Sequence, residues 1–293
     1  MGTPWRDTPS WTIVEQAEAA LGRTLAPLLL DPDATLERTD DAQLSVLLTS
    51  LLAWHAVADR IEAPVAFAGH SLGQLTALIA SGALALDDGV RLAAARAECT
   101  QAAGERRPGR LAALMGTTPE LAEEACALRG PRRCWVANDN APGQVVLGGT
   151  PDGVDAAGAR ARELGCKRVV ALKVAAAFHT PLMEKALTAL APVLQATAFA
   201  PPSAPIVSNV DARPHADGAG WRTSLGTHLV STVRWRESMQ TLVDLGAGTF
   251  LEIGPGAVLS GLARRTVPQV ATLTVASPAD AANVVAAALE VAS

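Results

Sequence analysis

The chain has 293 residues, of which 49% are hydrophobic and 18% charged, and its formal net charge is -5. This composition excludes a disordered chain, and the acidic balance argues against nucleic acid as a partner. The length exceeds what one small core usually holds, so we expect a large domain that carries a smaller inserted one.

Neither the first residues nor the apolar stretches indicate export or a membrane span. The opening MGTPWRDTPSW has no basic segment followed by an apolar one, so no signal peptide is predicted. The longest uncharged apolar stretch, Ala42 to Val57, is shorter than the roughly 20 residues that a membrane helix needs. We therefore expect a cytoplasmic protein without membrane contact. Its four cysteines, which form no C-x-x-C pair, should be reduced, and no residue cluster has metal-ligand spacing.

Short apolar runs alternate with longer helical patterns along most of the chain. This alternation predicts an α/β fold, in which helices cover a parallel sheet. Pro64 opens the run VAFAG, a buried strand that ends at Gly69. We expect further strands at APIVSN and TFLEI, and helices over residues 11–31, 40–60, 72–83, 87–103, 181–195, 221–230 and 235–246.

Residues 109–174 have a different pattern. They read strand (RLAALMG), helix (119–129), strand (CWVAN), turn (NAPG), strand (QVVLGG), helix (151–165) and strand (KRVVALKV). The order βαββαβ is that of the ferredoxin-like unit. We therefore predict a small ferredoxin-like domain at 109–174, inserted into a large α/β domain made of residues 1–108 and 175–293.

A candidate nucleophile lies directly after the VAFA run. The segment GHSLG, from Gly69 to Gly73, matches the pattern G-x-S-x-G with Ser71 at its centre. The pattern calls for glycines on both sides because the strand-to-helix turn is tight, and we expect any side chain there to clash. The turn would present the Ser71 hydroxyl and leave the Leu72 N–H at a helix N-terminus to bind an oxyanion.

Five histidines compete for the role of general base. His179 follows a predicted strand and precedes a helix start, which places it at the sheet edge where open α/β sheets build their sites. A structural role for it stays open on these grounds alone. The other four are expected to lie in a helix (His55), beside the nucleophile but pointing elsewhere (His70), in a polar loop (His215) and in a helix (His228).

The order of these residues counts against an ordinary esterase. In α/β-hydrolases the acid follows the serine and the histidine lies near the C-terminus. Here no histidine lies beyond His228, and no acid is obviously paired with His179. A serine hydrolase or thioesterase nevertheless remains an alternative at this point.

Five segments occur in an order that resembles a known family: GHSLGQ, AAARAECTQ, ANDNAPGQVVLGG, FHTP and FLEIGPGAVLSGL. Together they resemble the malonyl-CoA:acyl carrier protein transacylases and the acyltransferase domains of polyketide synthases, over nearly the whole chain. The resemblance implies an α/β-hydrolase-like large domain with a parallel sheet and a ferredoxin-like insert. It places the active site in the cleft between the two.

The resemblance also assigns residues to roles. It implies that Ser71 is the nucleophile, that His179 is the general base, and that Arg96 binds the free carboxylate of the substrate. A guanidinium suits that task because its planar fork can bind a carboxylate through two parallel hydrogen bonds. Phe178, beside the base, matches the malonyl-selective type. The remaining matches are Asn138 and Asn140, which face the cleft, and His228, where many relatives have Gln and the backbone carbonyl orients the base.

The activity implied is transfer of a malonyl group from malonyl-CoA to the phosphopantetheine thiol of an acyl carrier protein, through an ester on Ser71. Neither a metal nor a bound cofactor is expected, since coenzyme A enters as part of the substrate. Whether the pathway makes fatty acids or polyketides stays open. Intact Ser71, His179 and Arg96 argue against the remaining alternative, an inactive scaffold.

The family's opening strand and Gly-Gln-Gly loop have no match in the sequence. In the relatives this loop precedes a segment resembling MGTPW, and the backbone N–H of its Gln is the second oxyanion donor. No Gly-Gln-Gly occurs here, and Met1 begins at the later segment. We therefore expect an upstream segment that completes the fold and the oxyanion site. The alternative is a real truncation that leaves a weak or inactive protein.

Overall fold

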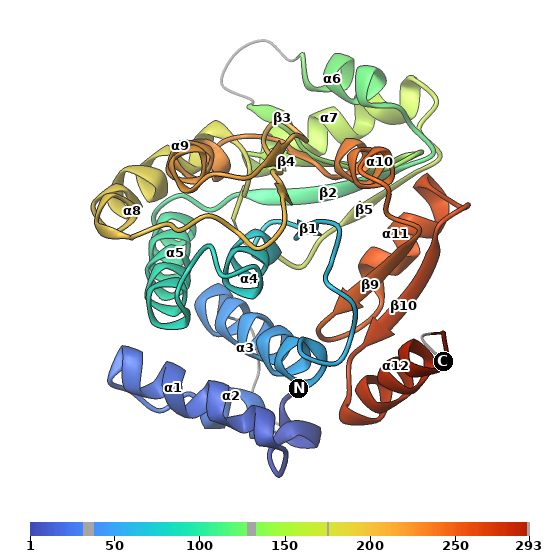
Figure 1. The fold of residues 1–293 in the computed structure, drawn as a ribbon. Helices are drawn as coiled ribbons and strands as arrows, with labels where there is room; N and C mark the ends of the chain where they lie inside the picture. Colours follow the sequence, from blue (N-terminus) through green and yellow to red (C-terminus); the bar gives the residue numbers. More distant parts are fainter. Residues whose placement is uncertain (32–37, 128–132, 175, 292–293) are drawn as a thin grey trace.

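The computed structural model describes residues 1–31, 38–127, 133–174 and 176–291. Figure 1 shows the sheet of the predicted small domain across the upper part, with the helices of that domain above it and the N-terminal helices, drawn in blue, below it. The helices of the whole chain are α1 Thr12–Leu21, α2 Ala26–Leu30, α3 Thr39–Val57, α4 Gly73–Ala80, α5 Leu86–Arg106, α6 Pro119–Cys126, α7 Pro151–Glu163, α8 Glu184–Ala196, α9 Gly218–His228, α10 Trp235–Asp244, α11 Val258–Thr266 and α12 Pro278–Val291. Its strands are β1 Phe67–Ala68, β2 Arg110–Met115, β3 Cys134–Ala141, β4 Gln144–Gly149, β5 Arg168–Ala171, β6 Ile206–Val207, β7 Pro214–His215, β8 Val233–Arg234, β9 Thr249–Ile253 and β10 Ala271–Val275.

The single helix predicted over residues 11–31 is wrong, because two helices occupy that segment. Gly22 ends α1 with a left-handed backbone, at φ 64°. The Glu18 carboxylate then accepts the Leu25 and Ala26 N–H groups at 2.7 and 2.9 Å. A carboxylate that caps the start of α2 compensates for the break, because the first N–H groups of a helix have no partner within it.

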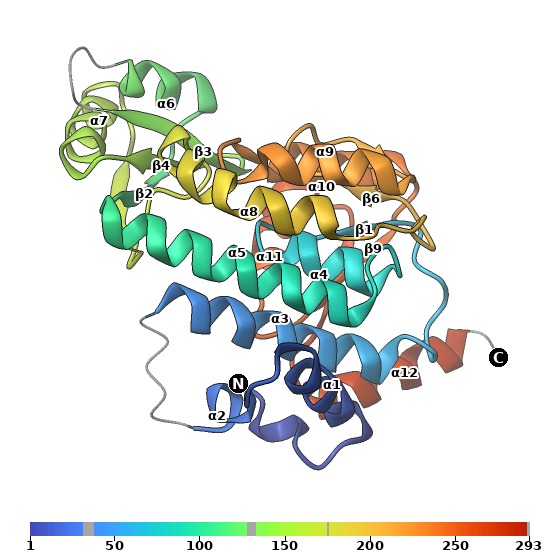
Figure 2. The same ribbon diagram turned by 90° about the vertical axis from the view of Figure 1, so that its left-hand side faces the viewer.

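Helix α3 runs through the centre of the large core. Its leucines Leu44, Leu47, Leu48 and Leu52 are fully buried, as expected for an aliphatic core. Helices α4 and α5 pack against α3, and α8 packs along α5, as Figure 2 shows from the side. No helix in the described ranges combines the length and the apolar character needed to cross a bilayer.

Parallel pairing is present in the large domain, but in two separate pieces. Strand β1 pairs in parallel with β6 through Phe67↔Ile206 and Ala68↔Val207, and β6 pairs with β7 in antiparallel fashion. Strands β9 and β10 form a second parallel pair. Strand β1 is short because the chain leaves the sheet at Gly69 to form the turn that carries Ser71.

The predicted βαββαβ order of the small domain is confirmed. Its strands lie in the order β5-β2-β4-β3, with antiparallel neighbours, and α6 and α7 pack against them. The two-residue strand β8, which was not predicted, adds to this sheet in parallel with β3. Residues from the C-terminal part of the chain therefore extend the small-domain sheet toward the large domain.

Strand β3 continues where a turn was predicted. It includes Asn138, Asn140 and Ala141, and the chain reverses only at Pro142-Gly143, where Gly143 has φ 74°. Two irregularities in the pairing of β3 with β4 lie between Val136 and Asn138 and between Asp139 and Ala141. Such bulges re-aim side chains, and here they coincide with the asparagines predicted to face the cleft.

Candidate active site

Ser71 lies in a sharp turn between β1 and α4, as the motif predicts. Its backbone is left-handed, at φ 53°, which is uncommon and strained for a residue with a side chain. Gly69 is sterically required, since a Cβ atom there would lie 1.9 Å from the Gly73 carbonyl oxygen. The corresponding expectation for Gly73 is wrong: a Cβ atom at that position would meet nothing within 4 Å.

His179 is brought to the nucleophile from a turn more than a hundred residues away. Its Nε2 lies 2.7 Å from Ser71 Oγ. Its Nδ1 lies 3.1 Å from the backbone carbonyl oxygen of His228, which can only accept. Nδ1 therefore carries the proton, and the Nε2 lone pair is free to accept the Ser71 proton. A carbonyl thus occupies the place that an acid has in a Ser-His-Asp triad, which explains why no acid could be paired with His179.

Burial keeps the His179 imidazole neutral. The side chain is 3% exposed, and desolvation, followed by the positive charge of Arg96, lowers its pKa to about 3. Desolvation also lowers the pKa values of His70 and His228. A base whose pKa lies below neutrality holds no proton at neutral pH and is ready to accept one.

Arg96 reaches the nucleophile from α5. Its Nη2 donates to Ser71 Oγ at 3.1 Å, and its Nη1 donates to Gln43 Oε1. The residue is 4% exposed, and burial lowers its pKa to about 10, so it is charged at neutral pH. Within the described ranges Arg96 forms no ion pair, and its Nε has no acceptor. A buried guanidinium without a carboxylate is costly unless a ligand supplies the anion.

The Leu72 N–H is placed as expected for an oxyanion donor. Leu72 is the residue immediately before α4, where the helix leaves its first N–H groups without internal partners. No acceptor for this N–H is found among the described residues. The N-terminus of a helix also favours negative charge.

Of the two small-domain asparagines, one contacts the nucleophile segment. The His70 Nε2 lies 2.8 Å from Asn140 Oδ1, so His70 points away from Ser71 and toward β3. Asn138 is buried on the same strand, but in the described part of the chain its side chain makes no hydrogen bond to Ser71 or His179. Between them, the buried Asp139 carboxylate pairs with Arg236 of α10 at 2.8 Å.

Phe178 packs where the two domains meet. It is partly buried against the large core and also against the small-domain residues Leu111, Ala113 and Val146. The next residue, His179, has a left-handed backbone, at φ 60°. The ring therefore lies directly beside the base, as the resemblance implies.

Two polar residues of the site were not predicted. Gln43 bridges Arg96 to Thr100, since its Nε2 donates to Thr100 Oγ1 at 3.0 Å. Asn209 accepts the Ser71 N–H at 2.7 Å. An amide within the uncharged stretch from Ala42 to Val57 was the available signal for Gln43. Nothing in the neighbourhood of Asn209 in the sequence marks it, because its contacts come from distant segments.

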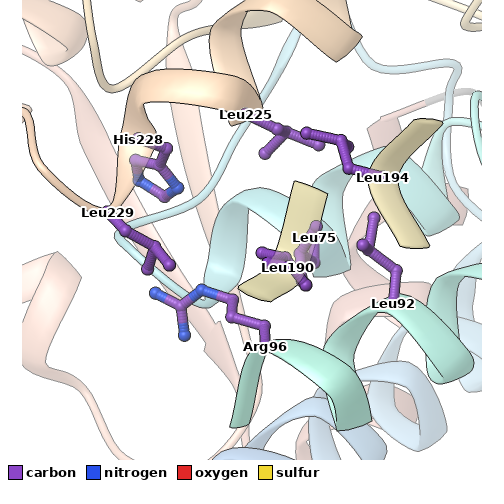
Figure 3. A pocket seen from close by; sticks show the side chains of 8 residues that line it. All are labelled: Leu75, Leu92, Arg96, Leu190, Leu194, Leu225, His228 and Leu229. Carbon is purple, nitrogen blue, oxygen red and sulfur yellow. The ribbon is translucent and has the colours of Figure 1, made fainter. Parts of the chain in front are cut away.

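A narrow cavity of about 10 Å³ lies beside Arg96 and His228, and Figure 3 shows the side chains that line it. Apart from these two side chains its walls are leucines: Leu75, Leu92, Leu190, Leu194, Leu225 and Leu229. Across the described residues, no group of three or more potential metal ligands occurs. The polar side chains around Ser71 are one guanidinium, imidazoles and amides.

Comparisons with known proteins identify the family of the chain. The model of the acyl transferase domain family matches residues 10–288. The malonyl CoA-acyl carrier protein transacylase of Escherichia coli K12 is 37% identical over 290 residues, which cover 96% of this chain and 92% of that protein. The crystal structure of FabD from Acinetobacter baumannii superposes with a TM-score of 0.92 at 31% identity, over 99% of this chain and 94% of that one.

A second similar structure holds a type II polyketide synthase acyl-carrier protein in complex with its malonyl-transacylase. It superposes with a TM-score of 0.91 at 31% identity and covers 99% of this chain and 94% of that one. The two-domain fold, the serine turn and the similarity over nearly the whole length all agree. The chain belongs to the acyl transferase domain family.

Proposed function

We propose that this chain transfers a malonyl group from malonyl-CoA to the phosphopantetheine thiol of an acyl carrier protein, through an ester on Ser71. The similar proteins carry this activity in their names, and one of the similar structures is a complex with a carrier protein. The product serves fatty acid or polyketide synthesis. The reaction needs no bound cofactor, and we place it in the cytoplasm.

The unpaired guanidinium of Arg96 is the observation that carries the proposal. It lies 3.1 Å from Ser71 Oγ, so a carboxylate bound to it would belong to a short acyl group on that oxygen. A malonyl group has its carboxylate one carbon from the acyl carbonyl, which suits this short separation. A hydrolase for neutral acyl chains has no use for such a cation at the nucleophile.

The first half-reaction forms the acyl-enzyme. His179 Nε2 takes the proton of Ser71, and Oγ bonds to the thioester carbonyl carbon. The Leu72 N–H donates to the oxygen that becomes negative, and Arg96 holds the substrate carboxylate. The carbon–sulfur bond then breaks, and the coenzyme A sulfur takes the proton back from His179.

The second half-reaction repeats these steps with the carrier protein. His179 takes the proton of the phosphopantetheine thiol, whose sulfur attacks the malonyl ester. The carbon–oxygen bond to Ser71 breaks, and its oxygen regains the proton from His179. Because His228 O holds Nδ1 in place, the same imidazole nitrogen serves in both directions.

The test compares transfer with hydrolysis. Purified enzyme is incubated with malonyl-CoA, with and without a holo acyl carrier protein, and both malonyl-carrier and free malonate are quantified by mass spectrometry. The proposal predicts malonyl-carrier as the main product and slow malonate release when the carrier is absent. Rapid malonate release that the carrier does not suppress would identify a thioesterase instead.

A further inference from the structure

Asn209 lies at the centre of a hydrogen-bond network around the nucleophile. It is fully buried in the turn that follows β6. Its Oδ1 accepts the Ser71 N–H at 2.7 Å, and its Nδ2 donates to the Gly69 carbonyl oxygen at 2.9 Å. One amide therefore holds the backbone on both sides of His70, directly at the strained turn.

The backbone of Asn209 is held as well. Its N–H donates to Gln74 Oε1 of α4 at 2.8 Å, and its carbonyl accepts the Arg234 N–H of β8 at 2.9 Å. The amide is thereby fixed between the helix that follows the nucleophile and the strand that extends the small-domain sheet. A side chain held at this many points can impose a backbone conformation on its neighbour.

The hydrogen bonds of the Asn209 amide determine which nitrogen of the His228 ring carries a proton. The Ser71 N–H can only donate and the Gly69 carbonyl can only accept, so they determine which end of the Asn209 amide is oxygen. His228 Nε2 lies 3.3 Å from that oxygen and must carry a proton to donate to it. The ring is buried, and desolvation keeps its pKa well below the ordinary value, so it is neutral.

His228 is therefore linked to both Ser71 and His179. It bonds directly to His179, and it reaches Ser71 through Asn209. Its backbone carbonyl accepts the His179 Nδ1–H, and its side chain contacts the amide that holds Ser71. The rest of the ring faces the leucine-lined cavity of Figure 3. In the described part of the structure, the Asn209 oxygen is the one hydrogen-bond partner of the His228 ring.

We propose that Asn209 and the His228 imidazole are positioning residues that together hold Ser71 in its left-handed conformation and in register with His179. The inference rests on the proposed role of Ser71 as the nucleophile. Neither side chain touches the reacting atoms, so their loss should lower the rate of Ser71 acylation and leave substrate affinity nearly unchanged. Supporting groups of this kind typically contribute a factor of about 10–100.

The main test measures kcat and KM for malonyl transfer in Asn209→Ala beside a matched control, Ser208→Ala. Ser208 is equally buried in the same segment, but its hydroxyl bonds to Ser224 and Val210 and not to the nucleophile turn. We expect kcat to fall about 10–100-fold in Asn209→Ala with KM within about threefold, and Ser208→Ala to stay within about twofold. Equal losses in the two variants would show that the segment matters only for folding, and would overturn the proposal.

His228 is tested by two substitutions that keep its backbone carbonyl. His228→Gln retains an N–H donor for Asn209, whereas His228→Leu removes it and matches the apolar cavity walls. We expect His228→Gln to approach the wild-type rate and His228→Leu to lose about three- to tenfold, with no further loss when it is added to Asn209→Ala. Equal rates for the Gln and Leu variants would refute the linkage even if Asn209→Ala fails to fold, and fully additive losses would refute it if that variant folds.

A second readout separates this inference from the proposed function. A fluorophosphonate labels reactive serines without any acyl-CoA, so its rate reports the readiness of Ser71 alone. We expect the same ranking of variants as in malonyl transfer. A wild-type enzyme that resists the label would count against Ser71 as nucleophile. Normal labelling in both wild type and Asn209→Ala would count against Asn209 alone.

Discussion

The large and small domains contribute to the same site in different ways. The residues proposed to react or to bind charge come from two strained turns and a helix of the large domain; they are Ser71, His179 and Arg96. The small domain contributes the bulged strand β3, whose Asn140 contacts His70 and not Ser71 or His179. The chemistry is thus built into the large domain, while the small domain closes one side of it.

The electrostatics of the two regions also differ. Near Ser71 the buried ionisable groups are Arg96, His179 and His228, and the hydrogen-bond acceptors that hold them include amides and a backbone carbonyl. On β3 the buried Asp139 already has its cation in Arg236. Among the described residues near Ser71, the buried cation without an ion pair is Arg96, which lies on the large-domain side. This contrast predicts that large-domain substitutions change the chemistry and small-domain ones change docking.

The largest effect that tests this difference between the domains is expected when His179 is replaced. His179→Ala should lower malonyl transfer about 10²–10⁴-fold, because the His179 ring is the one general base in hydrogen-bond contact with Ser71 Oγ among the described residues. His55→Ala is a suitable control, since His55 is exposed in α3 and its ring contacts Ser10 instead. Steady-state rates of malonyl transfer by the two variants test the role of His179 as the general base. A loss below tenfold in His179→Ala would contradict its role.

The next effect concerns charge recognition by Arg96. Removing the guanidinium leaves the malonyl carboxylate unpaired in a buried site, at a cost of about 2–5 kcal/mol. Arg96→Ala should therefore lose malonyl transfer and gain relative activity with acetyl-CoA. Arg91→Ala, on the exposed side of the same helix, should change neither. An unchanged ratio of malonyl to acetyl kcat/KM in Arg96→Ala would show that the carboxylate binds elsewhere.

A smaller effect is expected at Phe178, where the two domains meet. The ring beside His179 leaves less room for an α-methyl group, and one methyl is worth about 1–3 kcal/mol. We expect a preference of about 10–200-fold for malonyl-CoA over methylmalonyl-CoA, reduced in Phe178→Ser and largely kept in Phe178→Leu. Competition between the two thioesters measures this preference. Equal kcat/KM values for them in the wild type would remove Phe178 from the specificity argument.

The smallest effect on activity is expected from exposed arginine and lysine residues, which form separate clusters in the two domains. Arg264 and Arg265 end α11 in the large domain, where Arg265 is tied to Gln144 and Pro142, whereas Lys167 and Arg168 are exposed in the small domain. The paired position Arg132 lies outside the described residues, next to the exposed Arg133. An acidic carrier protein should meet one of these clusters, although any single exposed charge contributes little.

Charge reversal decides which cluster it is. Arg264→Glu is compared with Arg168→Glu, and Arg60→Glu in a distant loop serves as control. At the true cluster KM for the carrier protein should rise several-fold with KM for malonyl-CoA unchanged, and the salt dependence should weaken. If none of these clusters behaves in this way, docking depends on some other surface.

The features that were predicted best from the sequence depend on residues that are close together along the chain. The turn at Ser71 follows from a five-residue motif in its strand–turn–helix context, and the small domain follows from its order of elements. His179 was assigned only through the family resemblance, because its partner is 108 residues away. Asn209 was missed for the same reason, since its bonds reach Gly69 and Ser71 across 140 and 138 residues. Strand β8 is two residues long and has no periodicity to detect.

The proposed malonyl transfer depends most directly on an ester between the malonyl group and Ser71. Intact-mass spectrometry after incubation with malonyl-CoA, without a carrier protein, tests it in one step. The wild-type chain should gain one malonyl group, which a holo carrier protein then removes, and Ser71→Ala should gain none. A malonyl adduct that persists in Ser71→Ala, or transfer at an undiminished rate by that variant, would contradict the account.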